Sequence, residues 1–257
     1  MTLTYTSSNG NSYNLRGSVI RTRRADFNTF KWLPQTVGRQ YGVYVKQFNR
    51  DPFQFTILLD IAGSLSDKMA TLNALHEAFD HDILTMTPGR LSVGDYYVDC
   101  YITFSSTYYQ KPWTQNEITA YCPYPFWQKN HTYSFSGEAV GTETVTNPGA
   151  GAAEFILTIH GPTTTSTCWI KCNDQKIGCQ VELDTGDKVV INSRDKTVLA
   201  YYNSLPLVDS PVDAFTTRIK EGSIFQKIPS GSSAVEWNGD MTFEMIVCEE
   251  RSEPLWT

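Results

Sequence analysis

Residues 53–104 read FQFTILLDIAGSLSDKMATLNALHEAFDHDILTMTPGRLSVGDYYVDCYITF, and this stretch decides the fold. It opens with apolar residues at every second position from Phe53 to Leu59, which share one face on a strand. From Leu65 the apolar spacing changes to three and four, the period of an amphipathic helix. From Val98 to Phe104 the period is two again. Because a helix of roughly four turns is unstable alone, we expect it to lie across a sheet made by the flanking strands.

The predicted helix has its own start and stop signals. Its apolar stripe consists of Leu65, Met69, Leu72, Leu75 and Phe79. Ser64 is placed to accept hydrogen bonds from the first turn, and Asp67 three residues later can complete a capping box. The apolar pattern closes at Asp80-His81-Asp82, and Pro88-Gly89 marks the exit from the element.

Length and composition indicate two domains of mainly β structure with one α-helix. A chain of 257 residues can bury two cores, and its 13% aromatic content favours short strands. We predict a β-rich domain with the embedded helix over residues 1–130 and a β-sandwich over residues 131–257. Short alternating segments such as Phe155–Ile159 and Met241–Val247 recur in the second half with turn signals between them, which is typical of a sandwich.

The two halves differ in formal charge. Residues 1–130 hold 12 Lys and Arg against 10 Asp and Glu, and residues 131–257 hold 9 against 17, so the net charges are +2 and −8. An acidic half repels nucleic-acid phosphates and anionic lipid. No signal peptide is recognisable, and no apolar run approaches the roughly 20 residues of a membrane span. We therefore expect synthesis in the cytoplasm and no membrane insertion.

The polar residues 1–15 are expected to form a flexible arm or an edge hairpin. Arg21, Arg23 and Arg24 form the densest basic cluster of the chain. We interpret the cluster as a solvated strand face, and a phosphate-binding site is the alternative.

Two further predictions concern connections in the first half. Residues 41–48 alternate as a strand, and the turn Asn49-Arg50-Asp51-Pro52 is expected to pair them with the strand at Phe53. The aromatic and proline-rich residues 108–127 suit a stiff, packed connector, which places the domain boundary near Lys129.

No catalytic constellation is recognisable. His76 and Asp80 have helical i, i+4 spacing, which reads as a polar helix surface, with catalysis or metal binding as the alternative. Cys168 and Cys172 permit a metal site, but with Ile170 they share one strand face, which favours buried thiols. The sequence has no nucleophile elbow, HExxH motif or phosphate loop. We predict no enzyme activity, no catalytic residue, no metal and no cofactor, and rank a polysaccharide-degrading enzyme last.

Sugar binding stays open as an alternative function. Aromatic rings can stack on sugars, and Trp169 and Trp237 are the candidate contacts, although a tryptophan of this kind is more often partly buried core than a stacking platform. On this hypothesis the second half is a carbohydrate-binding adhesion module that recognises a host cell-surface glycan.

The order of elements resembles the distal tail proteins (Dit) of phages with long non-contractile tails and of related prophages. The motifs that carry the likeness are the helix residues Leu72, Leu75 and Phe79, residues 88–98 (PGRLSVGDYYV), the strand 100–105, and Asn147-Pro148-Gly149 before Phe155–Pro162. Residues 32–39 depart from the Gly-rich loop expected there. The His-x-Asn-Pro-Arg string of sugar-binding galectins is also missing, so sugar binding does not follow from the resemblance.

The resemblance implies a structural protein at the tip of the virion tail, assembled in the host cytoplasm. Its first domain would pack into a homo-hexameric ring, or two rings back to back, whose hole continues the tail tube and passes DNA without specific binding. Its galectin-like second domain would hold receptor-binding or arm proteins, while a tail-associated lysin or tip protein docks beneath. Unpaired strand edges accept a neighbouring chain, so we expect ring contacts at Tyr41, Val43, Val45 and Phe48.

Overall fold

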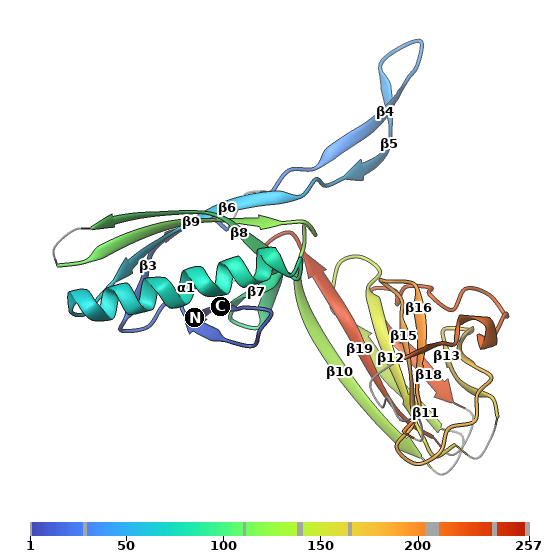
Figure 1. Ribbon diagram of the computed structural model, residues 1–257. Helices are drawn as coiled ribbons and strands as arrows, with labels where there is room; N and C mark the ends of the chain where they lie inside the picture. Colours follow the sequence, from blue (N-terminus) through green and yellow to red (C-terminus); the bar gives the residue numbers. More distant parts are fainter. Residues whose placement is uncertain are drawn as a thin grey trace. The chain divides into compact units, whose positions relative to one another are not determined.

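The computed structural model describes residues 2–27, 30–109, 112–137, 141–163, 166–203, 211–237 and 241–254. Figure 1 shows a mainly β chain with one α-helix in its first half. The chain divides into two compact units: Met1–Gln128 together with the chain end from Arg251, and Lys129–Glu250. The fold class predicted from the pattern of apolar residues is confirmed.

The division of the chain differs from the predicted domains in one respect. The change of unit at Lys129 lies close to the expected boundary, but the chain end from Arg251 belongs to the first unit and not to the second. Within the first unit the Arg251 guanidinium lies 6.0 Å from the centre of the Tyr96 ring. This cation–π contact gives the returning segment a local reason to join that unit.

In its described residues the first unit contains nine complete strands, the first residues of a tenth and the helix. Their bounds are β1 (Leu3–Thr6), β2 (Ser12–Asn14), β3 (Ile20–Ala25), β4 (Leu33–Gly38), β5 (Val43–Asn49), β6 (Phe53–Ile61), α1 (Leu65–Leu84), β7 (Gly89–Val93), β8 (Tyr96–Tyr109), β9 (Thr114–Cys122) and β10 (Trp127–Gly137). The strand β8 connects two runs of antiparallel strands. Its first five residues pair with β7, which pairs in turn with β1 and β2, and its remainder pairs with β9, which leads to β6 and β3.

The helix α1 begins as predicted and covers the core of this unit. Ser64 accepts from the backbone N–H of Asp67, whose carboxylate accepts in return from the Ser64 N–H, so the capping box is confirmed. Leu72, Leu75 and Phe79 are buried in one cluster with the strands. Each such side chain contributes about 1.5–3 kcal/mol when it leaves water.

The helix also differs from its prediction. It continues to Leu84, two residues beyond the Asp80-His81-Asp82 run at which the apolar pattern closes. The predicted stripe residues Leu65 and Met69 are 70% and 37% exposed, because the buried face shifts toward Ala78 and Asp82. The apolar pattern ended the helix too early because Asp82, a charged residue, lies on the buried face of the helix.

Two predicted connections of the first half are wrong. The strand β5 pairs with β4 and not with β6, so the hairpin uses the turn at residues 39–42. The stretch from 108 to 127 is not a connector, because its central residues Thr114–Cys122 form β9, which lies between β6 and β8. Trp127 is fully buried in the core of this unit. The aromatic and proline-rich stretch therefore contributes one strand to the sheet and Trp127 to the core.

The N-terminal segment forms an edge hairpin, one of its two predicted alternatives. Strands β1 and β2 pair with each other, and β1 also pairs with β7. The basic cluster lies on β3, which contains a bulge between Thr22 and Arg24. Arg21, Arg23 and Arg24 are exposed, which agrees with a solvated strand face.

The second unit is a sandwich of two antiparallel sheets around one core. One sheet has the order β17-β16-β15-β12-β19-β10 and the other β11-β18-β13-β14. The strands are β11 (Gly141–Asn147), β12 (Glu154–His160), β13 (Cys168–Cys172), β14 (Gln175–Cys179), β15 (Lys188–Asn192), β16 (Thr197–Tyr201), β17 (Val212–Asp213), β18 (Gly231–Trp237) and β19 (Met241–Arg251), with a 3₁₀ turn at Phe215–Thr217. Period-two patterns located β12, β13, β15, β16 and β19.

The thiols expected in the core are found there. Cys168 and Cys172 are 1% and 4% exposed on β13, in one cluster with Ile170. The buried-hydrophobe interpretation is confirmed for this strand. Within the described ranges, no helix combines the length and apolar character that crossing a membrane requires.

Candidate assembly surface

The hairpin of β4 and β5 exposes more large apolar side chains than a solvated strand pair needs. Tyr41 is 87% exposed, Val43 64%, Val45 39% and Phe48 58%. Val37 and Tyr44 are exposed as well. The structure therefore brings the four predicted ring-contact residues together on one hairpin, although Tyr41 lies in its turn and not in a strand.

This hairpin also has two unpaired edges. Its strands pair only with each other in the described part of the chain, and every residue of β5 is exposed. A two-stranded hairpin is at best marginally stable in water, and open edges accept further strands. Both properties are typical of a segment that becomes ordered against a partner.

The base of the hairpin is held by an arginine among aromatic rings. The Arg50 guanidinium lies 5.6 Å from the ring centre of Phe30, 5.4 Å from Trp32 and 4.8 Å from Phe126. Burial lowers the pKa of Arg50 from its ordinary value, while the rings attract its positive charge. These contacts fix where the hairpin leaves the unit. Sequence reasoning missed them because the rings come from separate segments.

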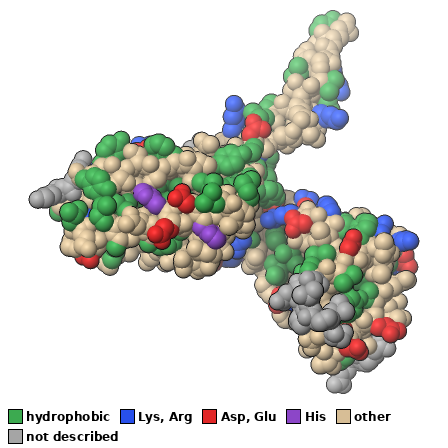
Figure 2. Space-filling view, viewed as in Figure 1, with side chains coloured by type: hydrophobic (Ala, Val, Ile, Leu, Met, Phe, Trp, Pro, Cys, Tyr) green, Lys and Arg blue, Asp and Glu red, His purple; other side chains and the backbone are tan. Residues whose placement is uncertain are grey.

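A second set of exposed apolar side chains lies where β8 ends and β9 begins. Phe104, Tyr108, Tyr109 and Trp113 are between 37% and 62% exposed. Figure 2 shows hydrophobic side chains on the visible face of this unit and on the hairpin. Patches of this kind mark protein contacts more often than free solvent surface.

The two predicted sugar contacts do not lie in equivalent surroundings. Trp237 is 5% exposed and packs against Phe135 and Phe243, with ring centres 5.8 and 5.4 Å away. The ring is core, so the prediction of a sugar contact at Trp237 is wrong. Trp169 is partly exposed, with the Lys176 ammonium 5.2 Å from its ring centre. A sugar contact there stays a prediction.

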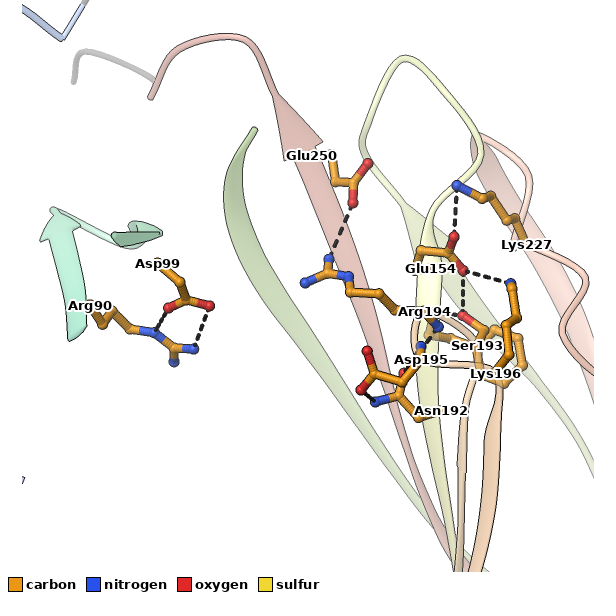
Figure 3. A network of polar contacts seen from close by, with 11 residues as sticks. Arg90, Asp99, Glu154, Asn192, Ser193, Arg194, Asp195, Lys196, Lys227 and Glu250 are labelled. Atoms are coloured by element: carbon orange, nitrogen blue, oxygen red, sulfur yellow. Dashed lines mark hydrogen bonds and ion pairs between the residues drawn. The ribbon is translucent and has the colours of Figure 1, made fainter. Parts of the chain in front are cut away.

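The charged groups of the second unit satisfy one another at one end of its larger sheet (Figure 3). Glu154 lies 2.8 Å from the Lys227 ammonium and accepts a 2.6 Å hydrogen bond from the Ser193 hydroxyl. Burial alone would raise the pKa of Glu154, but its bonds to Lys227 and Ser193 hold the pKa below its usual range. Arg194 pairs with Glu250 at 3.2 Å. The network joins strands and turns, and the Ser193 hydroxyl that donates to Glu154 is fully buried.

The remaining polar candidates make structural contacts. His76 Nε2 lies 3.0 Å from the Ser105 hydroxyl across the helix–strand contact, and His131 Nε2 lies 2.8 Å from Glu249. Asn147 donates to the carbonyls of Gly151 and Ile228, which fixes the loop that enters the sandwich. In the described part of the chain, no three His, Cys, Asp or Glu side chains gather closely enough to hold a metal ion.

Among the comparisons with known proteins, only the comparison of structures found matches, and these show the fold. No family model matches the sequence, and no curated protein matches it. The Dit protein (gp 19.1) of SPP1, described as a paradigm of the hub adsorption apparatus in phages that infect Gram-positive hosts, matches with a TM-score of 0.65. The alignment covers 96% of this chain and 99% of that protein at 9% identity. This chain has the Dit fold.

Two structures of the phage P2 baseplate in its activated conformation contain a chain with the same Dit fold. The structure with Ca matches at a TM-score of 0.65 and 10% identity, covering 99% of this chain and 100% of that chain. The structure with Sr matches equally, with coverage of 98% and 99%. The resemblance, whose close motifs lie within residues 53–130, is therefore confirmed as a fold. It extends over both units, including the sandwich, where close motifs were few.

Proposed function

We propose that this chain is a structural protein of a phage tail tip, where it forms a ring of six copies within the hub or baseplate. The observation that carries the proposal is the coverage of the Dit fold. The Dit protein of SPP1 and a chain of the phage P2 baseplate have this arrangement over nearly their whole length, with 96–99% of the present chain aligned. A chain recruited for another role would be expected to retain one unit of such a two-part fold and not both.

The ring contact in this proposal is the hairpin β4–β5. A cyclic ring needs two different surfaces that match after rotation. The hairpin offers one of them, because Val43, Val45 and Phe48 are exposed beside unpaired edges. The exposed residues at the ends of β8 and β9 are available as the second surface. Burial of these side chains on assembly would stabilise both the ring and the hairpin.

The proposed position at the tail tip also assigns a role to each unit. The first unit surrounds a hole that continues the tail tube and passes DNA without base-specific contacts. The second unit supports receptor-binding or arm proteins, and a lysin or tip protein docks against the ring. We propose no catalytic step, since the polar groups described above are engaged in holding strands and turns.

The decisive experiment measures the mass of the purified protein over a dilution series by light scattering, followed by negative-stain imaging of the largest species. A hexamer or dodecamer with a central hole is expected. Val43→Pro, which removes a backbone donor from β5, and Val45→Asp should both yield folded monomers. Val212→Asp, at a 45% exposed site on β17, is the matched control and should keep the ring. A ring that survives both hairpin variants would place the contact elsewhere.

A sugar-binding role for the second unit is the other candidate, and Trp169 is the residue that favours it. Its partly exposed ring beside Lys176 offers one stacking face. Saturable binding to a host cell-wall glycan that disappears in Trp169→Ala, with the ring intact, would support this function in addition to assembly.

A further inference from the structure

Two cysteines of the first unit lie opposite each other on neighbouring strands. The register of β8 and β9 pairs Tyr101 with Tyr121, and the next position along the two antiparallel strands brings Cys100 opposite Cys122. The side chains of directly opposite residues point to the same face of the sheet, with Cα atoms about 4.5–5.5 Å apart. A disulfide requires Cα atoms about 4.4–6.8 Å apart. The register, continued by one position, therefore implies a Cα spacing that suits a disulfide bond.

The pair lies where β8 changes its partner from β7 to β9. Cys100 is the last residue of β8 that pairs with β7, facing Gly89, and the next residue starts the ladder with β9. Cys122 is the last residue of β9 and faces Phe53 on its other side. A covalent link here would hold β8 to β9 where the two strand runs diverge, a place where a ladder otherwise opens first.

Both thiols are fully buried in the core and are present as free cysteines. We propose that Cys100 and Cys122 form a latent disulfide site, which is reduced in a reducing compartment and closed by a small-molecule disulfide once the protein meets an oxidising medium. The inference does not rest on the function proposed above, because it concerns one strand pair within one unit.

The chemistry is an ordinary thiol–disulfide exchange. The Cys122 thiolate attacks one sulfur of oxidised glutathione and releases one glutathione, which takes up the proton lost by Cys122. The Cys100 thiolate then attacks the Cys122 sulfur of the mixed disulfide and releases the second glutathione with the proton lost by Cys100. Two protein thiols are oxidised to one disulfide, and one small-molecule disulfide is reduced to two thiols.

Burial controls the rate of this reaction. Loss of solvent, followed by the hydrogen bond with the neighbouring Cys100 thiol, raises the pKa of Cys122 far above its ordinary value. The attacking thiolate is therefore scarce while the strands stay closed. We expect slow oxidation of the folded protein, with a rate that rises when low urea concentrations increase local opening.

The second cross-strand pair provides an internal comparison. Cys168 and Cys179 are in register on β13 and β14, but the Cys168 thiol donates to the Val181 carbonyl at 3.9 Å. That thiol is engaged by a backbone acceptor, so this pair is not included in the proposal.

The test incubates the full chain with glutathione buffers of rising oxidised fraction, with and without urea below the unfolding midpoint. After acid quenching and denaturation, free thiols are alkylated and the protein is analysed by intact and peptide mass spectrometry. The expected product has lost two hydrogens and yields a linked peptide pair containing residues 100 and 122. Its thermal midpoint should rise by about 5 °C, and dithiothreitol should reverse both changes.

Variants make the assignment specific. Cys100→Ser and, separately, Cys122→Ala should abolish the linked pair, whereas Cys172→Ser, which also removes a buried cysteine, should retain it. Alkylation of both Cys100 and Cys122 at every oxidant level, including samples opened by urea, would overturn the proposal. Stable glutathione adducts without the protein disulfide would overturn it as well.

Discussion

Tyr5 and Asp82 lie 77 positions apart in the chain, and the Tyr5 hydroxyl donates a hydrogen bond to Asp82 Oδ2. The other carboxylate oxygen accepts from the Ser7 hydroxyl at 2.7 Å and from the backbone N–H of Ser8 at 2.7 Å. The Ser8 hydroxyl donates as well, at 2.6 Å. One fully buried carboxylate thus fastens the N-terminal hairpin to the end of the helix.

Replacement of this carboxylate should loosen the N-terminal hairpin. In Asp82→Asn the amide nitrogen faces donors that need an acceptor, so we expect the free energy of unfolding of the first unit to fall by about 2 kcal/mol. Urea denaturation measures the change, and amide exchange at β1 should accelerate. Asp80→Asn, at an exposed site on the same helix, is the control and should change stability little.

The same carboxylate predicts a pH dependence. Burial raises the pKa of Asp82, but the hydrogen bonds from Ser8, Tyr5 and Ser7 outweigh burial and hold the pKa below its ordinary value. A folded-state pKa below the unfolded value of about 3.9 gives stability that is complete above pH 4 and is lost as the pH falls through the folded pKa. The gap between wild type and Asp82→Asn in urea should therefore shrink at low pH. An unchanged gap at pH 2 would contradict this assignment.

Gly89 should tolerate no side chain. A Cβ built at this residue would overlap Asp82 Oδ2 and the Tyr5 hydroxyl. Gly89→Ala is therefore expected to break the bond between these groups and to lower the thermal midpoint of the first unit. Gly151→Ala, where a Cβ meets nothing within 4 Å, is the matched control. Equal thermal midpoints in the two variants would show that the close contact of Gly89 with Asp82 and Tyr5 does not contribute to stability.

The two tryptophans offered as sugar contacts should separate in a stability measurement. Trp237→Ala removes a ring from the core of the sandwich and should cost about 3–5 kcal/mol. Trp169→Ala removes a partly exposed ring with one cation–π contact and should cost about 1 kcal/mol or less. Urea denaturation followed by circular dichroism checks both. A Trp237 variant as stable as the Trp169 variant would contradict the buried assignment.

The network at Glu154 should stabilise the second unit above pH 4. Its pKa is held below the unfolded value of about 4.3, so the contribution is complete above that value and disappears as the pH falls through the folded pKa. Glu154→Gln should reduce the free energy of unfolding by about 1–2 kcal/mol at pH 7 and by less in acid. Glu143→Gln, at an exposed site on β11, should have no such effect.

Much of the architecture could be predicted from local periodicity. The change of period near Leu65, the capping box at Ser64 and the alternation in β6, β8 and β12 each depend on residues close together in the chain. The helix–sheet arrangement and the two-part order followed from these patterns, and they were enough to suggest the Dit fold at 9–10% identity. Local patterns succeed here because a strand or helix has to bury one face whatever its partners are.

The tertiary structure alone decided what depends on distant partners. Strand pairing is one case: β5 pairs with β4 and β9 lies beside β6, although spacing along the chain favoured other choices. The environment of polar groups is another. Asp82 was expected to end the helix, and the structure shows that it also binds Tyr5. Trp237 had two explanations from the sequence, a sugar contact or core, and the structure places it in the core. Hydrogen-bond partners and burial arise only when segments far apart in sequence meet, so the sequence alone sets the elements and the assembled fold sets their contacts.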